Sequence, residues 1–174
     1  MAPASESAKA VANEFLKIAD EAGKTITPMK LQKLVYFAHG WKLGITGEPL
    51  IREDIEAWQY GPVVRSLYHE FKEFSLSDID KRATELEITD IEKFSMHLYE
   101  PELQDEDARN LVRRIWDVYG DYTATKLSNM THEPGTPWHA IAKRYQREAD
   151  LGEEVPKGTP IPNELIGSYF ANKV

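Results

Sequence analysis

The sequence predicts a mainly α-helical fold with a minor β component. Three observations support this fold class. Apolar residues recur at helical spacing over most of the chain, and glycine or proline stands where these periodic stretches would begin or end. No internal repeat or Pro/Gly/Ser-rich linker divides the 174 residues, of which 41% are hydrophobic. Since this is enough to close one hydrophobic core, we expect a compact single-domain helical bundle spanning residues 1–174, with one or two short strands.

The first two periodic stretches predict helices over residues 8–22 and 28–44. Gly23 follows the first stretch, where a left-handed cap residue would sit. In the second, Thr27 is suited as N-cap, and the fixed φ of Pro28 fits the first helical position. Gly44 is expected to end this helix. The predicted buried faces consist of Val11, Ala12, Phe15, Ile18 and Ala19 in the first helix and Leu31, Leu34, Val35, Ala38 and Trp41 in the second.

The next segment predicts a strand followed by a third helix. Residues 55–60 fit a short strand, with Ile55, Ala57 and Gln59 on one face and Glu56, Trp58 and Tyr60 on the other. Gly61 and Pro62 then predict the start of a helix that continues to Phe74. Its apolar stripe would consist of Val63, Val64, Leu67, Tyr68, Phe71 and Phe74.

Residues 74–107 form an acidic segment, which we expect to be a variable part of the domain. It holds eleven acids and three bases, so its formal charge of −8 equals the net charge of the whole chain. Such a segment is either a solvated surface insertion or a docking surface for a basic partner. Leu86 and Ile88 alternate with charged residues in residues 84–89, which indicates a short half-exposed strand or an extended arm.

The last part of the chain predicts four further helices. An apolar stripe runs from Leu103 to Tyr119 and ends at Gly120, and a shorter stripe covers residues 124–130. Thr136 and Pro137 cap another helix that continues to Tyr145. After a loop with Pro156, Gly158 and Pro160, a final short helix begins at Pro162.

Composition excludes several classes of protein. Without cysteine there can be no disulfide, thiolate metal site or cysteine nucleophile. No apolar run approaches the roughly 20 residues that a membrane span needs, and Met1–Ala10 is polar rather than a secretion signal. The acidic balance argues against nucleic acid as the main ligand, because binding its backbone requires lysine and arginine. With a mean hydropathy of −0.51, a cytoplasmic protein is expected.

Neither a metal site nor a catalytic constellation is expected. His132-Glu133 resembles the start of the zinc helix motif, but the next histidine, His139, is seven positions away, and prolines interrupt any helix between them. Ser66 and Ser128 lack the Gly-x-Ser-x-Gly elbow of hydrolases. We therefore expect no enzyme and no cofactor. The four tryptophans are expected to pack in the core: Trp41, Trp58, Trp116 and Trp138.

Three ordered blocks of sequence resemble the Panacea-domain antitoxin family, which includes phage-associated GepA-like and SocA-like proteins. They are residues 27–41 (TPMKLQKLVYFAHGW), residues 55–64 (IEAWQYGPVV) and residues 126–140 (KLSNMTHEPGTPWHA). Together they span residues 27–140, which is most of the chain. The positions that carry the resemblance, here called the signature residues, are Pro28, Leu31, Gln32, Tyr36, Trp41, Trp58, Tyr60, Gly61, Pro62, His132, Pro137 and Trp138.

The resemblance implies a non-enzymatic antitoxin that neutralises a cognate protein toxin by direct binding. Family members pair with unrelated toxins, including small alarmone synthetases that modify tRNA, and a toxin of that type is one candidate partner. The signature residues are interpreted as scaffold, so we expect partner specificity outside the three blocks. The acidic segment is the largest such stretch, and its candidate partner-binding residues are Asp78, Asp80, Glu85, Glu87, Asp90 and Glu92.

Two other functions stay open. A prophage-encoded DNA-binding regulator would need a dense basic stripe, which the predicted helices lack, and the residues before Ala8 are too few for the DNA-binding domain that some members carry. A proteolysis adaptor that delivers a toxin to a protease would need a protease-docking surface that the sequence does not reveal. The toxin's identity and the oligomeric state are also left open.

Overall fold

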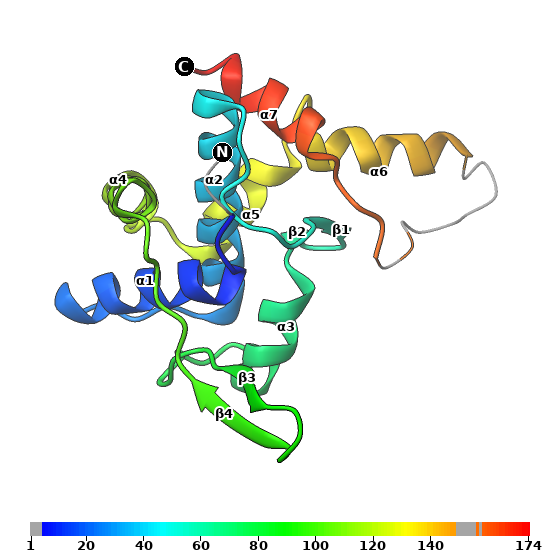
Figure 1. Cartoon of the computed structure of the whole chain (residues 1–174). Coiled ribbons are helices and arrows are strands. Elements are labelled where there is room, and N and C mark those ends of the chain that lie inside the picture. Colours follow the sequence, from blue (N-terminus) through cyan, green and yellow to red (C-terminus); the bar gives the residue numbers. More distant parts are fainter. Residues whose placement is uncertain (1–4, 149–155, 157) are drawn as a thin grey trace.

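The computed structural model describes residues 5–148, 156 and 158–174. Within these residues lie seven α-helices: α1 (Ala8–Glu21), α2 (Pro28–Thr46), α3 (Arg65–Phe71), α4 (Glu106–Tyr119), α5 (Ala124–His132), α6 (Pro137–Glu148) and α7 (Asn163–Ala171). The strands β1 (Glu56–Trp58) and β2 (Gly61–Val63) form one antiparallel pair, and β3 (Glu85–Asp90) and β4 (Ser95–Tyr99) form another. The short 3-10 helix η1 (Lys72–Phe74) follows α3. The prediction of a mainly α fold with minor β structure is confirmed (Figure 1).

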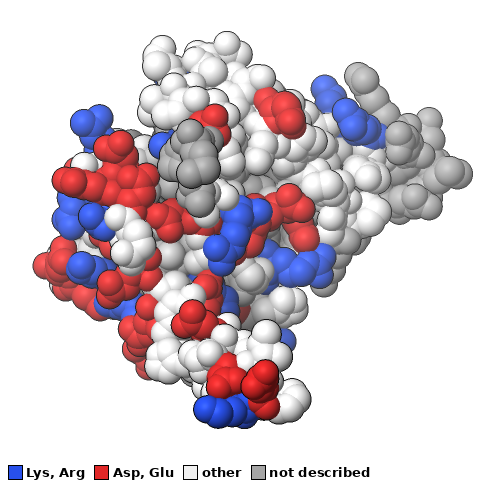
Figure 2. Space-filling view, in the orientation of Figure 1, with Lys and Arg blue, Asp and Glu red and all other residues white. Residues whose placement is uncertain are grey.

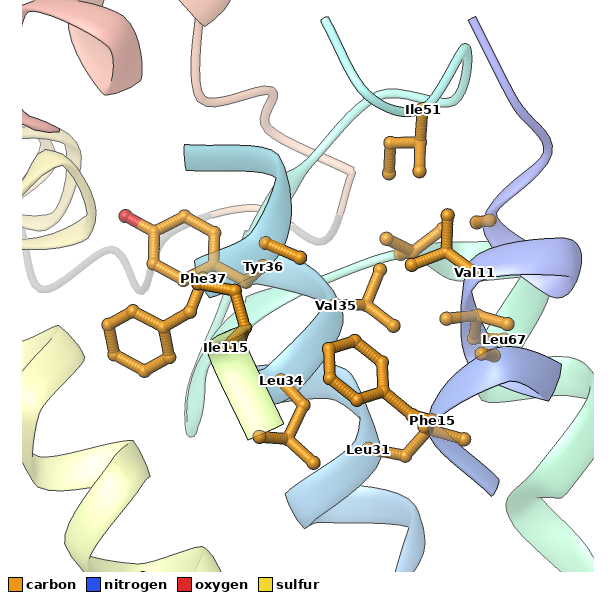
Figure 3. Packing of buried hydrophobic residues seen from close by; sticks show 14 of the residues in the cluster. Val11, Phe15, Leu31, Leu34, Val35, Tyr36, Phe37, Ile51, Leu67 and Ile115 are labelled. Atoms are coloured by element: carbon orange, nitrogen blue, oxygen red, sulfur yellow. The ribbon is translucent and has the colours of Figure 1, made fainter. Parts of the chain in front are cut away.

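Helix α2 is the central element of the fold. It contacts α1, α3, α4, α5, α7 and β2, and its buried residues lie on several sides of the helix. In Figure 3, Val35 points toward Val11 of α1, whereas Phe37 points away from it. The Phe37 ring stacks on that of Tyr119 in α4, with ring centroids 4.6 Å apart. A helix that is apolar nearly all round belongs in the interior, which explains why the other helices surround α2.

The capping residues predicted for the starts of α2 and α6 are confirmed. The Thr27 side chain accepts a hydrogen bond from the amide of Lys30, and Pro28 occupies the first turn. The Thr136 hydroxyl accepts one from the amide of His139 at the start of α6. Ser7, Asp105 and Thr123 act in the same way at α1, α4 and α5.

The expected end of the second helix at Gly44 is wrong. Helix α2 continues to Thr46, and Gly47 takes the left-handed cap with φ 73°. Gly44 has a different role, since a Cβ atom there would lie 2.7 Å from the Cβ atom of Phe170. The absence of a side chain lets α7 pack directly on α2.

The strand prediction for residues 55–60 holds only for Glu56–Trp58, and the third helix begins later than predicted. Gly61 and Pro62 do not open a helix but form β2, with Trp58 opposite Gly61 and Glu56 opposite Val63. Gly61 has φ 109°, which suits glycine and excludes helical backbone at this position. Helix α3 therefore starts at Arg65.

The tryptophans are less deeply placed than predicted. Trp116 is buried, and Trp41 and Trp138 are half-buried against the core. Trp58 is half-buried outside the core cluster, and its ring contacts that of Tyr68, with centroids 4.7 Å apart. Tyr68, assigned above to the buried face of the third helix, is exposed. The Trp58 and Tyr68 rings thus join β1 to α3 outside the core cluster.

Candidate functional site

Side chains of α2 bind one side of the β1–β2 hairpin backbone. The Gln32 side chain donates from Nε2 to the Val64 carbonyl at 3.0 Å and accepts from the Val64 amide at 2.9 Å. The Lys33 ammonium donates to the Pro62 carbonyl at 3.0 Å. Because these groups are buried, each bond satisfies a polar group that would otherwise be cut off from water.

Side chains of α5 and α6 bind the same hairpin. The Ser128 hydroxyl donates to the Tyr60 carbonyl at 2.9 Å, and His132 Nε2 lies 3.2 Å from the Gln59 carbonyl oxygen. The Trp138 indole donates to the Trp58 carbonyl at 2.7 Å. The three sequence blocks thus meet at one short hairpin, and their polar side chains are engaged with its backbone.

Lys33 is the most unusual charged residue of this cluster. Its side chain is 1% exposed, and burial lowers its pKa to about 7. A Cβ atom at Gly61 would lie 3.0 Å from Lys33 Cε and 2.6 Å from Thr131 Oγ1, so the hairpin backbone sits directly on both side chains. The hairpin covers Lys33, so this arrangement serves to hold the hairpin in place.

The remaining signature residues are spread over the core and the surface. Leu31 and Tyr36 are buried in α2, and the Trp41 indole donates to the Tyr119 hydroxyl at 3.0 Å. Pro137 begins α6, whereas Tyr60 is exposed at the turn of the hairpin. His39, next to this set, is buried with Nδ1 accepting from the Ile51 amide, and burial lowers its pKa.

No group of three or more metal-ligating residues occurs within the described part of the chain. None of the described helices has the length and apolar character to cross a membrane.

A second candidate site is the β3–β4 hairpin with its turn, residues 85–99, which we call the arm. It projects from the lower edge of the molecule in Figure 1. The predicted short strand or extended arm at residues 84–89 is confirmed as β3, whereas β4 was not predicted. The register pairs Leu86 with Leu98 and Ile88 with Met96, so these four side chains share one face. Glu85, Glu87, His97 and Tyr99 lie on the other face.

Buried polar contacts fix the base of the arm. Asn13 of α1 donates to the Ala83 and Pro101 carbonyls, each at 3.0 Å, and accepts from the Ala83 amide at 2.7 Å. Glu70 accepts from the Thr84 amide at 3.1 Å, and Lys9 bridges Glu70 and the Thr84 carbonyl. The chain before the arm is therefore anchored on α1 and α3, and the chain after it is anchored on α1.

The structure brings four of the six predicted partner-binding acids together on the arm. Glu87 and Glu92 are exposed, while Asp90 pairs with Lys93 at the turn. Glu85 lies 3.7 Å from Arg52 and accepts from the Tyr99 hydroxyl, a bond that raises the pKa of Tyr99. Asp78 and Asp80 are exposed in the segment before the arm. Figure 2 shows acidic and basic side chains side by side at the lower end of the molecule.

Sequence reasoning missed the apolar side of the arm. Phe94, Met96 and Leu98 are exposed, as are Leu86 and Ile88. The alternation of Met96 and Leu98 with Ser95 and His97 was the available signal. A groove of about 550 Å³ lies at the base of this face, and Leu86 and Leu98 line it together with Lys9, Arg52 and Glu70.

Comparison with known proteins decides the family. The family model described as "Antitoxin SocA-like, Panacea domain" matches residues 31–139, more than half of the chain. The chain belongs to this Panacea-domain antitoxin family. The matched Panacea domain contains both the β1–β2 hairpin and the arm.

A curated relative agrees with the family match. The chain is 34% identical to "Antitoxin SocA" of Caulobacter vibrioides (strain NA1000 / CB15N) over 150 residues, which cover 86% of this chain and 78% of the relative. No solved structure matches the chain. The resemblance described from the three blocks is confirmed. As a Panacea-domain antitoxin, the chain has an antitoxin role, which implies a toxin partner.

Proposed function

We propose that this Panacea domain neutralises its cognate toxin by direct protein–protein binding, without catalysis. The observation that carries the proposal is the arm, which projects from the helical body, is anchored at its base and exposes side chains to solvent. The signature residues Gln32, His132 and Trp138 support a scaffold role, because their polar groups bind the backbone of the β1–β2 hairpin and of the residue after it.

The acidic segment supports a partner with a basic face. A formal charge of −8 within residues 74–107 creates a local negative field that steers and retains cationic surfaces. A toxin that grips tRNA carries such a face, so a tRNA-modifying small alarmone synthetase is the toxin class we propose. Binding would then cover the surface that the nucleic acid needs. With a mean hydropathy of −0.51 and 29% charged residues, the antitoxin is proposed to act in the cytoplasm.

Co-expression with the product of the adjacent gene tests the function. We expect that gene product to arrest growth alone, and the antitoxin to restore growth and to co-purify with it. A neighbour that is harmless alone, or that stays toxic and fails to co-purify, contradicts the proposal. Restored growth that depends on a host protease, with loss of the toxin protein, would instead support the adaptor function. Promoter repression by the antitoxin alone would support the DNA-binding regulator.

A charge-reversal experiment tests the basic partner. Glu87→Lys with Glu92→Lys should slow association with the toxin and weaken its salt dependence, because both acids are exposed on the arm. Asp117→Lys with Glu48→Lys is the matched control, since both residues are exposed outside the acidic segment. Equal association rates for the two double variants would rule out electrostatic steering by the arm.

A further inference from the structure

We propose that the toxin contacts the apolar face of the arm, and that Phe94 at its turn is the anchor that enters an apolar recess rimmed by lysine and arginine. This inference rests on the proposed function and names the surface that performs it. The acids on the arm then steer the partner, while the apolar side chains hold it. The candidate partner-binding residues expected from the sequence are all acidic, and the proposal adds apolar residues to them.

The first support is the concentration of exposed apolar side chains on the arm. In the part of the chain that the structure describes, thirteen large hydrophobic residues are exposed, and seven of them lie within residues 86–99. Single exposed apolar residues are ordinary on protein surfaces, but contiguous apolar patches mark interaction sites. Four of the seven share one face through the strand register: Leu86, Ile88, Met96 and Leu98.

The second support is the backbone of Phe94. Its φ is 50°, in the left-handed region, and its side chain is 86% exposed. A bulky residue in this conformation is an outlier, because its Cβ atom crowds the following carbonyl. Exposure of the ring adds a second unfavourable feature that the folded chain itself does not compensate. Strained residues of this kind cluster at binding sites, where a partner makes use of the geometry.

The third support is the fixed base of the arm. Asn13 holds Ala83 and Pro101 together, and Glu70 and Lys9 hold Thr84. A hairpin anchored in this way is already placed for contact, so less conformational freedom is lost on binding than for a loose loop. This favours a docking element over a solvated insertion.

Charge favours the toxin over a second copy of this chain as the occupant. Glu85, Glu87, Asp90 and Glu92 lie on the arm against a single lysine, Lys93. A dimer formed through two arms would hold two sets of these acids, and repulsion between like charges opposes association. A partner with a basic rim would instead complement them.

Two arm variants and one control test the proposal. Phe94→Asn removes the ring and keeps a residue that tolerates the left-handed region. Ile88→Thr with Met96→Thr removes two apolar side chains and keeps strand-forming residues. Leu76→Asn is the control, because Leu76 is 85% exposed but lies outside the arm. The measurements are melting temperature and the affinity for the purified product of the adjacent gene.

We expect both arm variants to melt no lower than the parent and to raise the Kd for the toxin by about tenfold or more, as interface anchors do. Leu76→Asn should bind like the parent. If both arm variants bind and neutralise like the parent, the toxin contacts another surface, although the antitoxin function stands. If the parent itself fails to bind or neutralise, the proposed function fails and this inference with it.

Sedimentation of the antitoxin alone tests whether a second copy of this chain, rather than the toxin, covers the arm. A monomeric parent is expected. A parent that sediments as a dimer, with Phe94→Asn monomeric and toxin affinity unchanged, would assign the arm to self-association and overturn the proposal.

Discussion

Gln32 binds Val64 through both ends of its side-chain amide, donating to the carbonyl at 3.0 Å and accepting from the backbone amide at 2.9 Å. These two bonds join α2 to the chain between β2 and α3, and both Gln32 and Val64 are buried. A glutamine side chain here imitates a neighbouring strand, because it supplies one donor and one acceptor to the same residue. The central helix thereby sets the point at which β2 ends and α3 begins.

Loss of this bond pair should destabilise the protein. Gln32→Leu keeps the volume but leaves the amide and the carbonyl of Val64 buried without partners, at a cost of about 2–4 kcal/mol in the free energy of unfolding. Urea denaturation measures the change. Gln104→Leu is the control, since Gln104 is exposed and its side chain makes a long bond of 3.4 Å to the carbonyl of Glu102. A Gln32 variant as stable as the control would show that Val64 is satisfied in another way.

Lys33 should make stability depend on pH above neutrality. Its pKa is about 7 in the folded chain and 10.5 in its ordinary state, so between these values the unfolded chain binds more protons at this site. Stability therefore rises as pH increases, by about 2 kcal/mol between pH 7 and 8.5 from this group. Chemical denaturation at several pH values provides the measurement.

Lys33→Met serves as the comparison for that experiment. Methionine has a similar length and no charge, so the increase in stability between pH 7 and 8.5 should be absent from the variant. The same slope in both proteins would show that Lys33 remains charged in its buried position.

Gly40→Ala should destabilise the contact between α2 and α7. A Cβ atom at residue 40 would lie 2.2 Å from Phe170 Cε2, so the ring must move and the core must repack, at a cost of about 1–3 kcal/mol or more. Gly167→Ala in α7 is the matched control, because its Cβ would meet Leu43 Cβ at an ordinary 3.5 Å. Thermal melts should show a lower Tm for the first variant and an equal or higher Tm for the second. Equal losses in both would point to helix–helix crowding in general rather than to the ring of Phe170.

Asn13→Ala should loosen the arm. The variant leaves the Ala83 amide and the Ala83 and Pro101 carbonyls without this partner. We expect faster hydrogen exchange of backbone amides in residues 83–101 and weaker toxin binding, because the ordering of the arm then takes place on association. Lys17→Ala, an exposed substitution in the same helix, should change neither. Unaltered exchange in the Asn13 variant would mean that Glu70 and Lys9 suffice to hold the arm.

The helices and their caps could be predicted from the sequence because the signals are local. Thr27 accepts from an amide three residues away, and the apolar stripe of α2 repeats within its own length. Glycines were harder to interpret, because one residue type permits both a helix end and a close approach. Gly44 serves close approach, and the α7 backbone at Phe170 and Ala171 that requires it lies far along the chain.

The two candidate sites could likewise be predicted only in their local features. The three sequence blocks could be found individually, but their meeting at the β1–β2 hairpin depends on contacts such as Trp138 with Trp58 that no local pattern contains. On the arm, the acids were evident from composition. The apolar face was missed because the alternation of Leu86 and Ile88 suggested a half-buried strand, and only the pairing with β4 shows that the face has no cover within the described chain.

The Asn13 side-chain amide, which donates to the carbonyls of both Ala83 and Pro101, has an evolutionary consequence. Since the two ends of the arm meet at one side chain of the body, the residues between them can be exchanged without rerouting the core. The entropy of closing such an insert grows only slowly with its length, so hairpins of other sizes fit the same attachment point. Because we propose that the arm contacts the toxin, a different hairpin transplanted between Ala83 and Pro101 is expected to redirect the antitoxin to a different toxin.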